Sequence, residues 1–243
     1  MTTHEEIMTF SGMTSLPAGY RALVIGASGA LGSAFVSALR GDIRCAAVTE
    51  LSRSTHPGFA LEDAASIATT VATLASQGPF HLVIDATGAL VIDGAGPEKQ
   101  LAAVRADTLA RQFAVNATGP TLLLQALVPN LASGRVIYAK LSARVGSIAD
   151  NRKGGWYAYR AAKAALNMLL HTAALELAVR RPELVVAALQ PGTVASKLSA
   201  PFVSAEHATT AAEAARALLQ VLDGLPAQRG AYFRDSRGDD IPW

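Results

Sequence analysis

Two side chains that can move a proton lie four positions apart, at Tyr159 and Lys163. The stretch from Trp156 to Val179 reads as a helix, so both side chains project from the same face. A phenol with an ordinary pKa of about 10 is a poor base near neutral pH, but a nearby ammonium favours the phenolate and lowers that pKa. The pair therefore predicts proton exchange with an alcohol or carbonyl oxygen. On its own the spacing is a weak signal, because an exposed tyrosine over a lysine stem is equally common.

A glycine-rich turn with the spacing G-x-x-G-x-x-G follows the first apolar run, Ala22 to Gly26. Glycine at a strand-to-helix turn lets the backbone approach a pyrophosphate, and the helix N-terminus adds free N–H groups and a positive dipole. The spacing departs from G-x-G-x-x-G, and a tight turn without a ligand is the alternative. Ser28 is either a phosphate ligand or a turn-forming residue. We expect the turn to bind a dinucleotide through Gly26, Ser28, Gly29, Ala30, Leu31 and Gly32.

The choice between NAD and NADP depends on two residues near the end of the second apolar run, Cys45 to Leu51. An acid there accepts a hydrogen bond from the ribose 2′-OH of NAD, whereas a base pairs with the 2′-phosphate of NADP. Glu50 lies at about the expected distance from the glycines, and Arg53 follows in a Ser-Arg-Ser cluster that we place in the loop. We favour Arg53 and NADP, and keep Glu50 and NAD as the alternative.

These candidates need a scaffold that brings the ends of strands together. Short apolar runs alternate with longer Ala-rich stretches from Arg21 to Phe233. Strands buried on both faces read as continuous apolar runs, and the long intervals leave room for crossover helices. The pattern predicts an α/β fold with a doubly wound parallel sheet in a single domain, residues 20–243. Residues 1–19 lack periodicity, and we expect them to form a loosely ordered N-terminal arm.

The composition excludes several classes of protein. The 243 residues are 51% hydrophobic and 16% charged, which argues against disorder, and no apolar run reaches the roughly 20 residues of a membrane helix. The net charge is +2 with scattered Lys and Arg, so we expect neither nucleic acid nor a membrane as partner. Isolated histidines and the single Cys45 predict no metal and no internal disulfide. The N-terminus lacks a secretory signal, which predicts a cytoplasmic protein.

The order of the motifs resembles that of the short-chain dehydrogenase/reductase family. The resemblance runs from about Arg21 to Trp243 and rests on the glycine turn, Asp85-Ala86-Thr87-Gly88 after a strand, Asn116 in Asn-Ala-Thr-Gly-Pro, the Tyr159/Lys163 pair, and Pro191-Gly192-Thr193. The stretch 146–160 is similar to the branch of carbonyl reductases and C-factor-like developmental proteins, which commonly uses NADP. The resemblance implies a Rossmann fold with about seven strands, and hydride transfer between nicotinamide C4 and a small carbonyl or alcohol substrate.

The resemblance also implies roles for individual residues. Tyr159 is the acid/base, Lys163 lowers its pKa and holds the nicotinamide ribose, and Asn116 supports a water that links the lysine to solvent. The family usually has Asn-Asn-Ala-Gly after this strand, and Asp85 and Ala86 replace both asparagines. The residues that the resemblance places along the nicotinamide side of the cleft are Ala86, Thr87, Gly88, Pro191, Gly192 and Thr193.

The substrate-positioning serine of the family has no direct counterpart. It is the second serine of Ser-Ser-x-x-Gly, and counting back three residues from Gly146 places Ala143 in that position. Neighbouring side chains in a regular strand face opposite sides, but a bulge or turn at the strand end re-aims a side chain. We take Ser142 as the donor to the reacting oxygen, with Ser147 as the second candidate and a missing donor as the alternative.

The leading interpretation is an NADP-dependent carbonyl reductase or alcohol dehydrogenase. The alternative is a sensing or signalling protein that binds the dinucleotide with little turnover, which Ala143 favours and the intact Tyr159/Lys163 pair opposes. An enoyl or imine reductase on the same scaffold is a further alternative. The sequence does not identify the substrate, because its pocket is built from loops at 88–97, at 151–156 and after Thr193. The family's helical contacts imply a homodimer or homotetramer.

Overall fold

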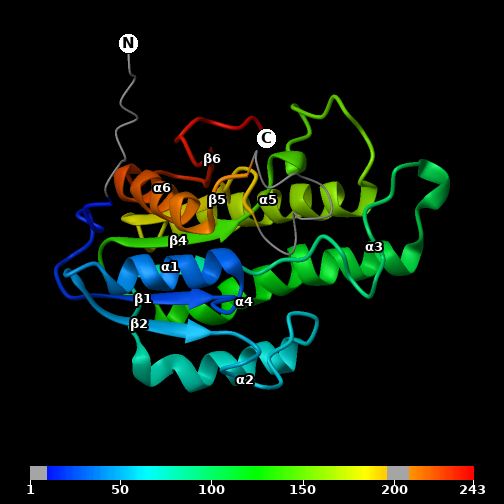
Figure 1. Ribbon diagram of the computed structural model, residues 1–243. Helices are drawn as coiled ribbons and strands as arrows, with labels where there is room; N and C mark the ends of the chain where they lie inside the picture. Colours follow the sequence, from blue (N-terminus) through cyan, green and yellow to red (C-terminus); the bar gives the residue numbers. More distant parts are fainter. Residues whose placement is uncertain (1–9, 196–207) are drawn as a thin grey trace, which may run out of the picture.

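A parallel sheet forms the centre of the computed structural model, which describes residues 10–195 and 208–243. Within these residues six strands run in the order β2-β1-β3-β4-β5-β6, and every neighbouring pair is parallel. The strands are β1 (Tyr20–Ile25), β2 (Cys45–Leu51), β3 (Leu82–Asp85), β4 (Val136–Leu141), β5 (Leu184–Gln190) and β6 (Tyr232–Asp235). Because all strands point the same way, their carboxyl ends meet at one edge of the sheet (Figure 1).

Helices cover both faces of the sheet. Helices α1 and α6 pack together on one face, and α2, α4 and α5 pack on the other, with α3 beside α5 (Figure 1). The helices are α1 (Ala30–Arg40), α2 (Ala64–Leu74), α3 (Ala106–Phe113), α4 (Gly119–Leu127), α5 (Tyr157–Leu177) and α6 (Ala211–Gly224). A π-helical turn, Ala114–Thr118, joins α3 to α4. The prediction of a doubly wound α/β fold is confirmed.

Burial on both faces explains the unbroken apolar runs of the strands. Every residue of β3 and β4 is buried. Along β1, Leu23 and Ile25 pack toward α2, α4 and α5, whereas Ala22 and Val24 pack toward α1 and α6. This alternation is the period of two that a pleated strand between two helical layers requires. The loops at the strand ends are therefore attached to a tightly packed core.

The sheet has six strands in the described residues, whereas the family resemblance implied about seven. The chain between β2 and α2 contains Pro57 and Gly58 and forms turns instead of a strand. The hydroxyl of Ser52 lies 2.8 Å from that of Ser54 and 3.2 Å from that of Thr55, and these local bonds close the first turn. Strand β2 is consequently an edge of the sheet.

The segment before β1 differs from the expected loosely ordered arm over residues 1–19. Residues 1–9 lie outside the described part of the chain. Met13 and Leu16 are buried in the core beside α1 and α6. The Asp42 carboxylate accepts a hydrogen bond from the Met13 N–H at 2.8 Å. Two apolar side chains and one buried carboxylate thus fix this part of the segment, and their spacing is too irregular for a periodicity argument to detect.

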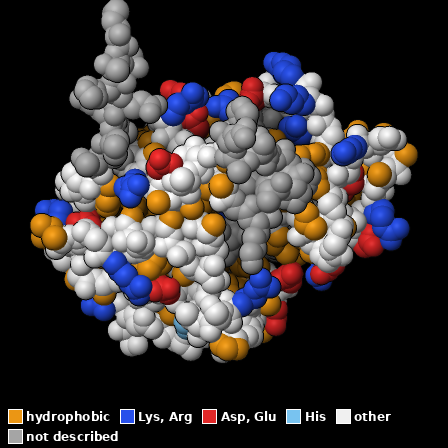
Figure 2. Space-filling view, in the orientation of Figure 1, with side chains coloured by type: hydrophobic (Ala, Val, Ile, Leu, Met, Phe, Trp, Pro, Cys, Tyr) orange, Lys and Arg blue, Asp and Glu red, His pale blue; other side chains and the backbone are white. Residues whose placement is uncertain are grey.

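The surface carries charges of both signs and one apolar helix face. Basic and acidic side chains lie interspersed on the face seen in Figure 2. None of the described helices is long and apolar enough to cross a membrane. On α5, Met168 and Leu175 are 66% and 40% exposed. This helix therefore presents apolar side chains to the outside as well as to the core.

Candidate active site

The candidate residues collect at the carboxyl edge of the sheet. Gly26 follows β1, Arg53 follows β2, Ala86 follows β3, Ser142 follows β4 and Pro191 follows β5. In open parallel sheets this edge is where ligands bind, because the loops after the strands converge there. The topology thus brings together residues from five separate parts of the described chain.

The turn after β1 has a conformation that requires glycine. Gly26 has a φ angle of +77°, and Gly29 donates its N–H to the Gly26 carbonyl at 2.9 Å. A Cβ atom at Gly32 would overlap the Gly26 oxygen, so a side chain there would push α1 away from the strand. Ser28 and Ala30 are exposed at the start of the helix. The turn leaves a backbone surface that a phosphate group can approach closely.

The N-terminus of α1 has no side-chain cap among the described residues, unlike those of α2 and α6. Asp63 caps α2 by accepting from two N–H groups, and Thr210 and Glu213 form a capping box at α6. Gly29 is the N-cap of α1 and offers no side-chain hydrogen bond. Uncapped N–H groups and the helix dipole favour an anion at this position. Both features fit the pyrophosphate of a dinucleotide.

The two residues that the sequence predicts to discriminate between NAD and NADP have different surroundings. Glu50, within β2, forms an ion pair with Arg40 of α1. Arg53 is exposed in the turn after β2, and it makes no hydrogen bond or ion pair with the residues that the structure describes. Its guanidinium is available to an anionic ligand, whereas the Glu50 carboxylate already has a cationic partner. The arrangement favours a 2′-phosphate at Arg53.

Tyr159 and Lys163 lie on the same buried face of α5, with exposed fractions of 8% and 3%. The Lys163 ammonium lies 5.6 Å from the centre of the Tyr159 ring. It donates to the carbonyl of Leu141, at the end of β4, at 3.1 Å. Tyr157 is 37% exposed, so it does not belong to this buried face. The helix thus directs one phenol and one ammonium toward the end of β4.

The pKa of Tyr159 shifts in the direction opposite to the one expected. Burial raises the pKa of Tyr159 to about 12. Burial, together with the nearby Lys140 ammonium, lowers the pKa of Lys163 well below its ordinary value, although Asp85 opposes this change. Both groups have lost their hydration, so each favours its neutral form. In these surroundings the Tyr159 phenol keeps its proton at neutral pH.

Asn116 fixes the loop that follows β3. It is fully buried in the π-helical turn, a type of distortion that occurs often at functional sites. Its Nδ2 donates to the Ala89 carbonyl at 2.8 Å and to Gln112 Oε1 at 2.7 Å, and its Oδ1 accepts from the Ala89 N–H at 3.1 Å. A Cβ atom at Gly88 would lie 3.0 Å from Asn116 Oδ1 and 3.4 Å from Lys163 Nζ. Asn116, Gly88 and Lys163 therefore meet at one point of the site.

Ser142 and Ser147 make different contacts. The Ser142 hydroxyl, one residue beyond β4, donates to Asn167 Oδ1 of α5 at 2.6 Å. The Ser147 hydroxyl accepts from the Asp150 N–H at 3.0 Å and thereby stabilises the following turn. Asn167 Nδ2 is buried and has no hydrogen-bond partner in the described chain. Ser142 thus contacts the helix that carries Tyr159, whereas Ser147 supports a loop.

The motifs do not predict the buried ion pair between Asp85 of β3 and Lys140 of β4. Lys140 Nζ lies 3.1 Å from Asp85 Oδ1, and both side chains are fully buried. The same carboxylate oxygen accepts from the Thr87 N–H at 2.9 Å. Asp85 therefore supports the loop after β3 in place of the family's asparagine. The available signal was a lysine inside an apolar run, next to a strand that ends in an aspartate.

The segment after β5 reaches the same edge. Gly192 follows Pro191 with a φ angle of +79°, and the Thr193 carbonyl accepts from the Thr209 N–H at 2.9 Å. This bond ties together the two ends of the segment that follows. Residues 196–207 lie outside the described residues, and with them most of the substrate-pocket segment expected after Thr193.

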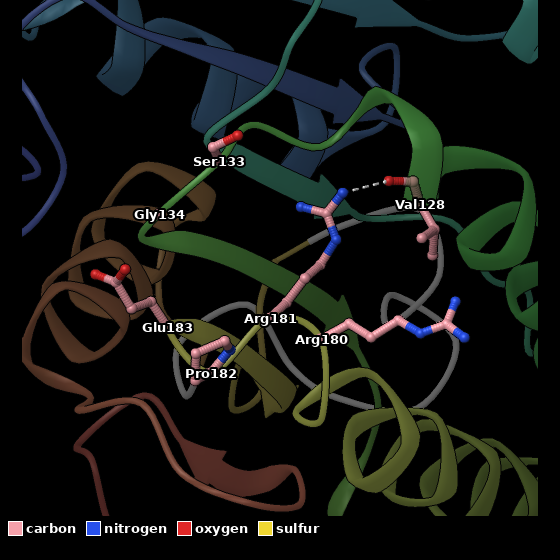
Figure 3. A pocket seen from close by; sticks show the side chains of 7 residues that line it. All are labelled: Val128, Ser133, Gly134, Arg180, Arg181, Pro182 and Glu183. Atoms are coloured by element: carbon pink, nitrogen blue, oxygen red, sulfur yellow. Dashed lines mark hydrogen bonds between the residues drawn. The ribbon is translucent and has the colours of Figure 1, made fainter.

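A surface hollow of about 450 Å³ lies at the opposite edge of the sheet (Figure 3). It is lined by segments that precede β4 and β5, namely Val128, Ser133, Gly134, Arg180, Arg181, Pro182 and Glu183. Arg181 extends toward Val128 and donates to the carbonyls of Ala132 and Val128 at 2.8 and 3.2 Å. The guanidinium ties two loops together, and the hollow is separate from the candidate active site.

A doubly wound sheet with a glycine turn at its carboxyl edge is typical of dinucleotide-binding α/β proteins. This chain belongs to the short-chain dehydrogenase family, whose model, described as short chain dehydrogenase, matches residues 21–207. It is similar to C-signal of Myxococcus xanthus, with 34% identity over 71% of this chain and 98% of the relative. It is also 29% identical to 1-hydroxy-2-glutathionyl-2-methyl-3-butene dehydrogenase of Rhodococcus sp. (strain AD45), over 77% of this chain and 80% of the relative.

Solved structures show the same fold at lower identity. The NADPH-bound carbonyl reductase from chicken fatty liver has a TM-score of 0.80 and 23% identity, with 96% of this chain and 97% of that chain covered. A short-chain dehydrogenase/reductase from Burkholderia multivorans with bound NADP has a TM-score of 0.72 and 22% identity, with 92% and 99% covered. The resemblance on which the sequence analysis relied is confirmed at the level of family and fold.

Proposed function

We propose that this protein is an NADP-dependent oxidoreductase that interconverts a small carbonyl compound and its alcohol. The observation that carries the proposal is the burial of Tyr159 and Lys163 on one face of α5, with Lys163 beside Gly88 at the carboxyl edge of the sheet. The uncapped start of α1 belongs to the same edge. Membership of the family and the similarity to proteins described as a dehydrogenase and as a carbonyl reductase support this function.

The residues at this edge fit NADP. The glycine turn would hold the pyrophosphate through Gly26, Ser28, Gly29, Ala30, Leu31 and Gly32, and Arg53 would pair with the 2′-phosphate. The nicotinamide nucleoside would be bordered by Ala86, Thr87, Gly88, Asn116, Tyr159, Lys163, Pro191, Gly192 and Thr193. The bound dinucleotide supplies or accepts the hydride. The NADPH and NADP found in the two similar solved structures support this choice over NAD.

Tyr159 is the proton donor and acceptor in this proposal. Because its pKa is raised to about 12, the phenol stays protonated at neutral pH and can donate to the oxygen of a reduced carbonyl. In the reverse direction the phenol must first lose its proton, so alcohol oxidation is expected to accelerate as the pH rises. In its protonated form, Lys163 stabilises the phenolate that forms when the proton leaves. Asn116 acts by holding the loop that carries Gly88.

Ser142 is the second proposed donor to the substrate oxygen. Its proton is now donated to Asn167 Oδ1, while the buried Asn167 Nδ2 has no partner among the described residues. Half a turn of the Asn167 amide exchanges these two atoms. Nδ2 then donates to Ser142 Oγ, and the serine proton is free for a substrate oxygen. Asn167 is therefore proposed as a positioning residue for Ser142.

The test of the function is NADPH consumption with a panel of aldehydes and ketones. NADPH binding is first measured by nucleotide fluorescence, with NADH as the comparison. We expect tighter binding of NADPH than of NADH, and formation of one alcohol for each NADPH consumed with at least one carbonyl. Tight binding of NADPH without consumption of any carbonyl, and without oxidation of the matching alcohols, would contradict the proposed reaction.

A sensing or signalling protein that binds NADP without useful turnover is the second candidate function. Ala143 lacks the hydroxyl that the family places there, and the Ser142 proton is donated to Asn167. The similarity to a protein described as C-signal also supports this candidate. The Ala143→Ser variant discriminates between the two functions. A large gain in turnover from a nearly inactive parent indicates sensing, whereas an active parent that changes little indicates the enzyme.

We further propose a cytoplasmic homodimer or homotetramer that associates through α5. Met168 and Leu175 lie on one stripe of this helix and are 66% and 40% exposed, opposite the face that carries Tyr159. Light scattering after size exclusion should give a mass of two or four chains. Met168→Glu should shift that mass toward one chain, and a monomeric parent would contradict the proposal.

A further inference from the structure

Two buried lysines, Lys140 of β4 and Lys163 of α5, lie near the buried carboxylate of Asp85 at the end of β3. Lys140 Nζ lies 3.1 Å from Asp85 Oδ1, and both side chains are fully buried. Lys140 also donates to the carbonyl oxygen of Thr87 and, at 3.1 Å, to its hydroxyl. The Lys140 ammonium therefore has both a counter-charge and a full set of acceptors.

Lys163 lies next to this cluster without a carboxylate partner of its own in the described residues. Its Nζ donates to the carbonyl of Leu141, the residue after Lys140. The same atom would lie 3.4 Å from a Cβ at Gly88, the residue after Thr87. The described charged or titratable groups around it are Lys140 from β4, Asp85 from β3 and Tyr159 from its own helix, and Tyr138 of β4 lies near Asp85.

We propose that Asp85 and Lys140 are positioning residues that set the charge state of Lys163. The catalytic role of Lys163 in this inference rests on the proposed function. The effect of Asp85 and Lys140 on the charge of Lys163 does not depend on that function. The single carboxylate of Asp85 is already paired with Lys140, so the fixed partner of Lys163 is one neutral carbonyl oxygen. A second ammonium nearby in a buried site disfavours the charged form of Lys163, whereas Asp85 favours it.

The opposing charges predict opposite effects on titration. Burial and then Lys140 lower the pKa of Lys163, and Asp85 raises it. Removal of Lys140 leaves Asp85 free to stabilise the Lys163 ammonium, so the pKa of Lys163 should rise. Removal of the Asp85 charge leaves two buried ammonium groups, so the pKa of Lys163 should fall. A purely structural ion pair does not predict opposite shifts, because both substitutions break the same contact.

The test is an NMR titration of Lys163 in Lys140→Met and Asp85→Asn. The chain has five lysines, so ¹³C labelling of lysine gives few signals, and Lys163→Met identifies the signal of interest. We expect the pKa of Lys163 to rise by about one pH unit or more in Lys140→Met and to fall by a similar amount in Asp85→Asn. Shifts in the same direction, or no shift in either variant, would overturn the proposal.

Two further variants separate charge from packing. Tyr138→Phe removes a buried hydroxyl near Asp85 without changing a charge, and the pKa of Lys163 should stay at the parent value. The double variant Asp85→Asn/Lys140→Met leaves the site without an unpaired charge from this pair, so it should fold even where a single variant fails. Its Lys163 pKa should lie below that of Lys140→Met. Equal values in these two variants would show that Asp85 has no influence, and the proposal would be wrong.

The consequence for catalysis is measured separately from the charge. The pH at which kcat/KM falls on the alkaline side should follow the pKa of Lys163, so it should rise in Lys140→Met and fall in Asp85→Asn. If the NMR shifts occur in a protein that reduces no carbonyl, the proposed function is wrong and the charge coupling stands. If the parent reduces carbonyls but the NMR shifts are absent, the coupling is wrong and the function stands.

Discussion

The two halves of the carboxyl edge present different parts of the chain to a ligand. The half formed by β1, α1 and β2 is called the backbone half, because it presents mainly backbone: an exposed glycine turn and a helix start without a side-chain cap. The other half, the buried half, is formed by β3, β4, α5, α3 and the π-helical turn, and its groups are buried side chains bonded to one another. Asn116 donates to Gln112, and Lys140 pairs with Asp85. We therefore expect substitutions in the first half to change cofactor affinity, and substitutions in the second half to change the rate.

Tyr159→Phe should have the largest effect and tests the second half directly. It keeps the buried ring but removes the proton donor, so turnover should fall by about 10²- to 10⁴-fold. NADPH affinity should stay near the parent value, because the hydroxyl contributes to proton transfer and not to the phosphate contacts. Steady-state kinetics with one carbonyl substrate and fluorescence titration with NADPH give the two quantities.

Tyr157→Phe is the matched control, since Tyr157 belongs to the same helix but is 37% exposed. It should leave both turnover and NADPH affinity near those of the parent. A large loss of turnover in Tyr157→Phe together with a silent Tyr159→Phe would show that the proton donor has been placed on the wrong tyrosine. A loss of NADPH affinity in Tyr159→Phe would instead remove the distinction between the two halves.

The backbone half could be predicted from the sequence because its requirements are local. The spacing of Gly26, Gly29 and Gly32 predicts positions where a side chain does not fit. The structure shows this at Gly32, where a Cβ atom would overlap the Gly26 oxygen. The alternation of apolar runs likewise predicted the layers of the fold, since a strand between two helical layers must be apolar on both faces. The resemblance implied about seven strands, and six lie in the described residues because the chain after β2 forms turns.

The buried half could be predicted only in part, because its charges act across strands. The spacing of Tyr159 and Lys163 predicts a shared helical face, but not that burial raises the pKa of the phenol. Lys140 and Asp85 are 55 positions apart, and only the register of β3 against β4 brings them together. Asn167, whose Oδ1 accepts the Ser142 proton, lies one helical turn after Lys163, but the Tyr–Lys spacing does not predict that its amide meets the end of β4.

Ser142→Ala is expected to lower the rate by about a hundredfold if the serine donates to the substrate oxygen. The Asn167 amide sharpens this prediction. In Asn167→Asp a carboxylate can accept the serine proton but cannot donate to the serine, so the rate should fall to a similar extent. In Asn167→Ala the acceptor is gone and the serine proton is released, so more of the rate should remain.

Single-turnover reduction by NADPH measures these variants without interference from product release. Ser147→Ala is the control, because its hydroxyl supports a loop, and it should lose little activity. Ala143→Ser should be neutral or slightly faster in an enzyme that already has its donor. A silent Ser142→Ala with a much faster Ala143→Ser would show that the parent lacks the donor, and would favour the sensing function.

Arg53→Ala tests the backbone half through the exposed side chain that is proposed to bind the 2′-phosphate. A charge-assisted hydrogen bond to an ion contributes about 1.5 to 3 kcal/mol, so NADPH affinity should fall by about ten- to a hundredfold. NADH has no 2′-phosphate, and its affinity should change little. Fluorescence titrations with both nucleotides give the ratio. An equal loss for NADPH and NADH, or a parent that prefers NADH, would assign the choice of cofactor to Glu50.

Arg40→Ala should have the smallest effect. It tests whether the ion pair with Arg40 keeps the Glu50 carboxylate from binding the ribose 2′-OH. The Arg40–Glu50 pair is partly exposed, at 63% and 30% of the two side chains, and such pairs contribute no more than about 1 kcal/mol. Loss of Arg40 frees the Glu50 carboxylate to accept from a ribose 2′-OH and to repel a 2′-phosphate. NADH affinity should therefore improve by no more than about fivefold, with a slight loss of NADPH affinity, and Arg40→Lys should resemble the parent. A much larger gain for NADH would mean that the ion pair, and not Arg53, sets the cofactor preference.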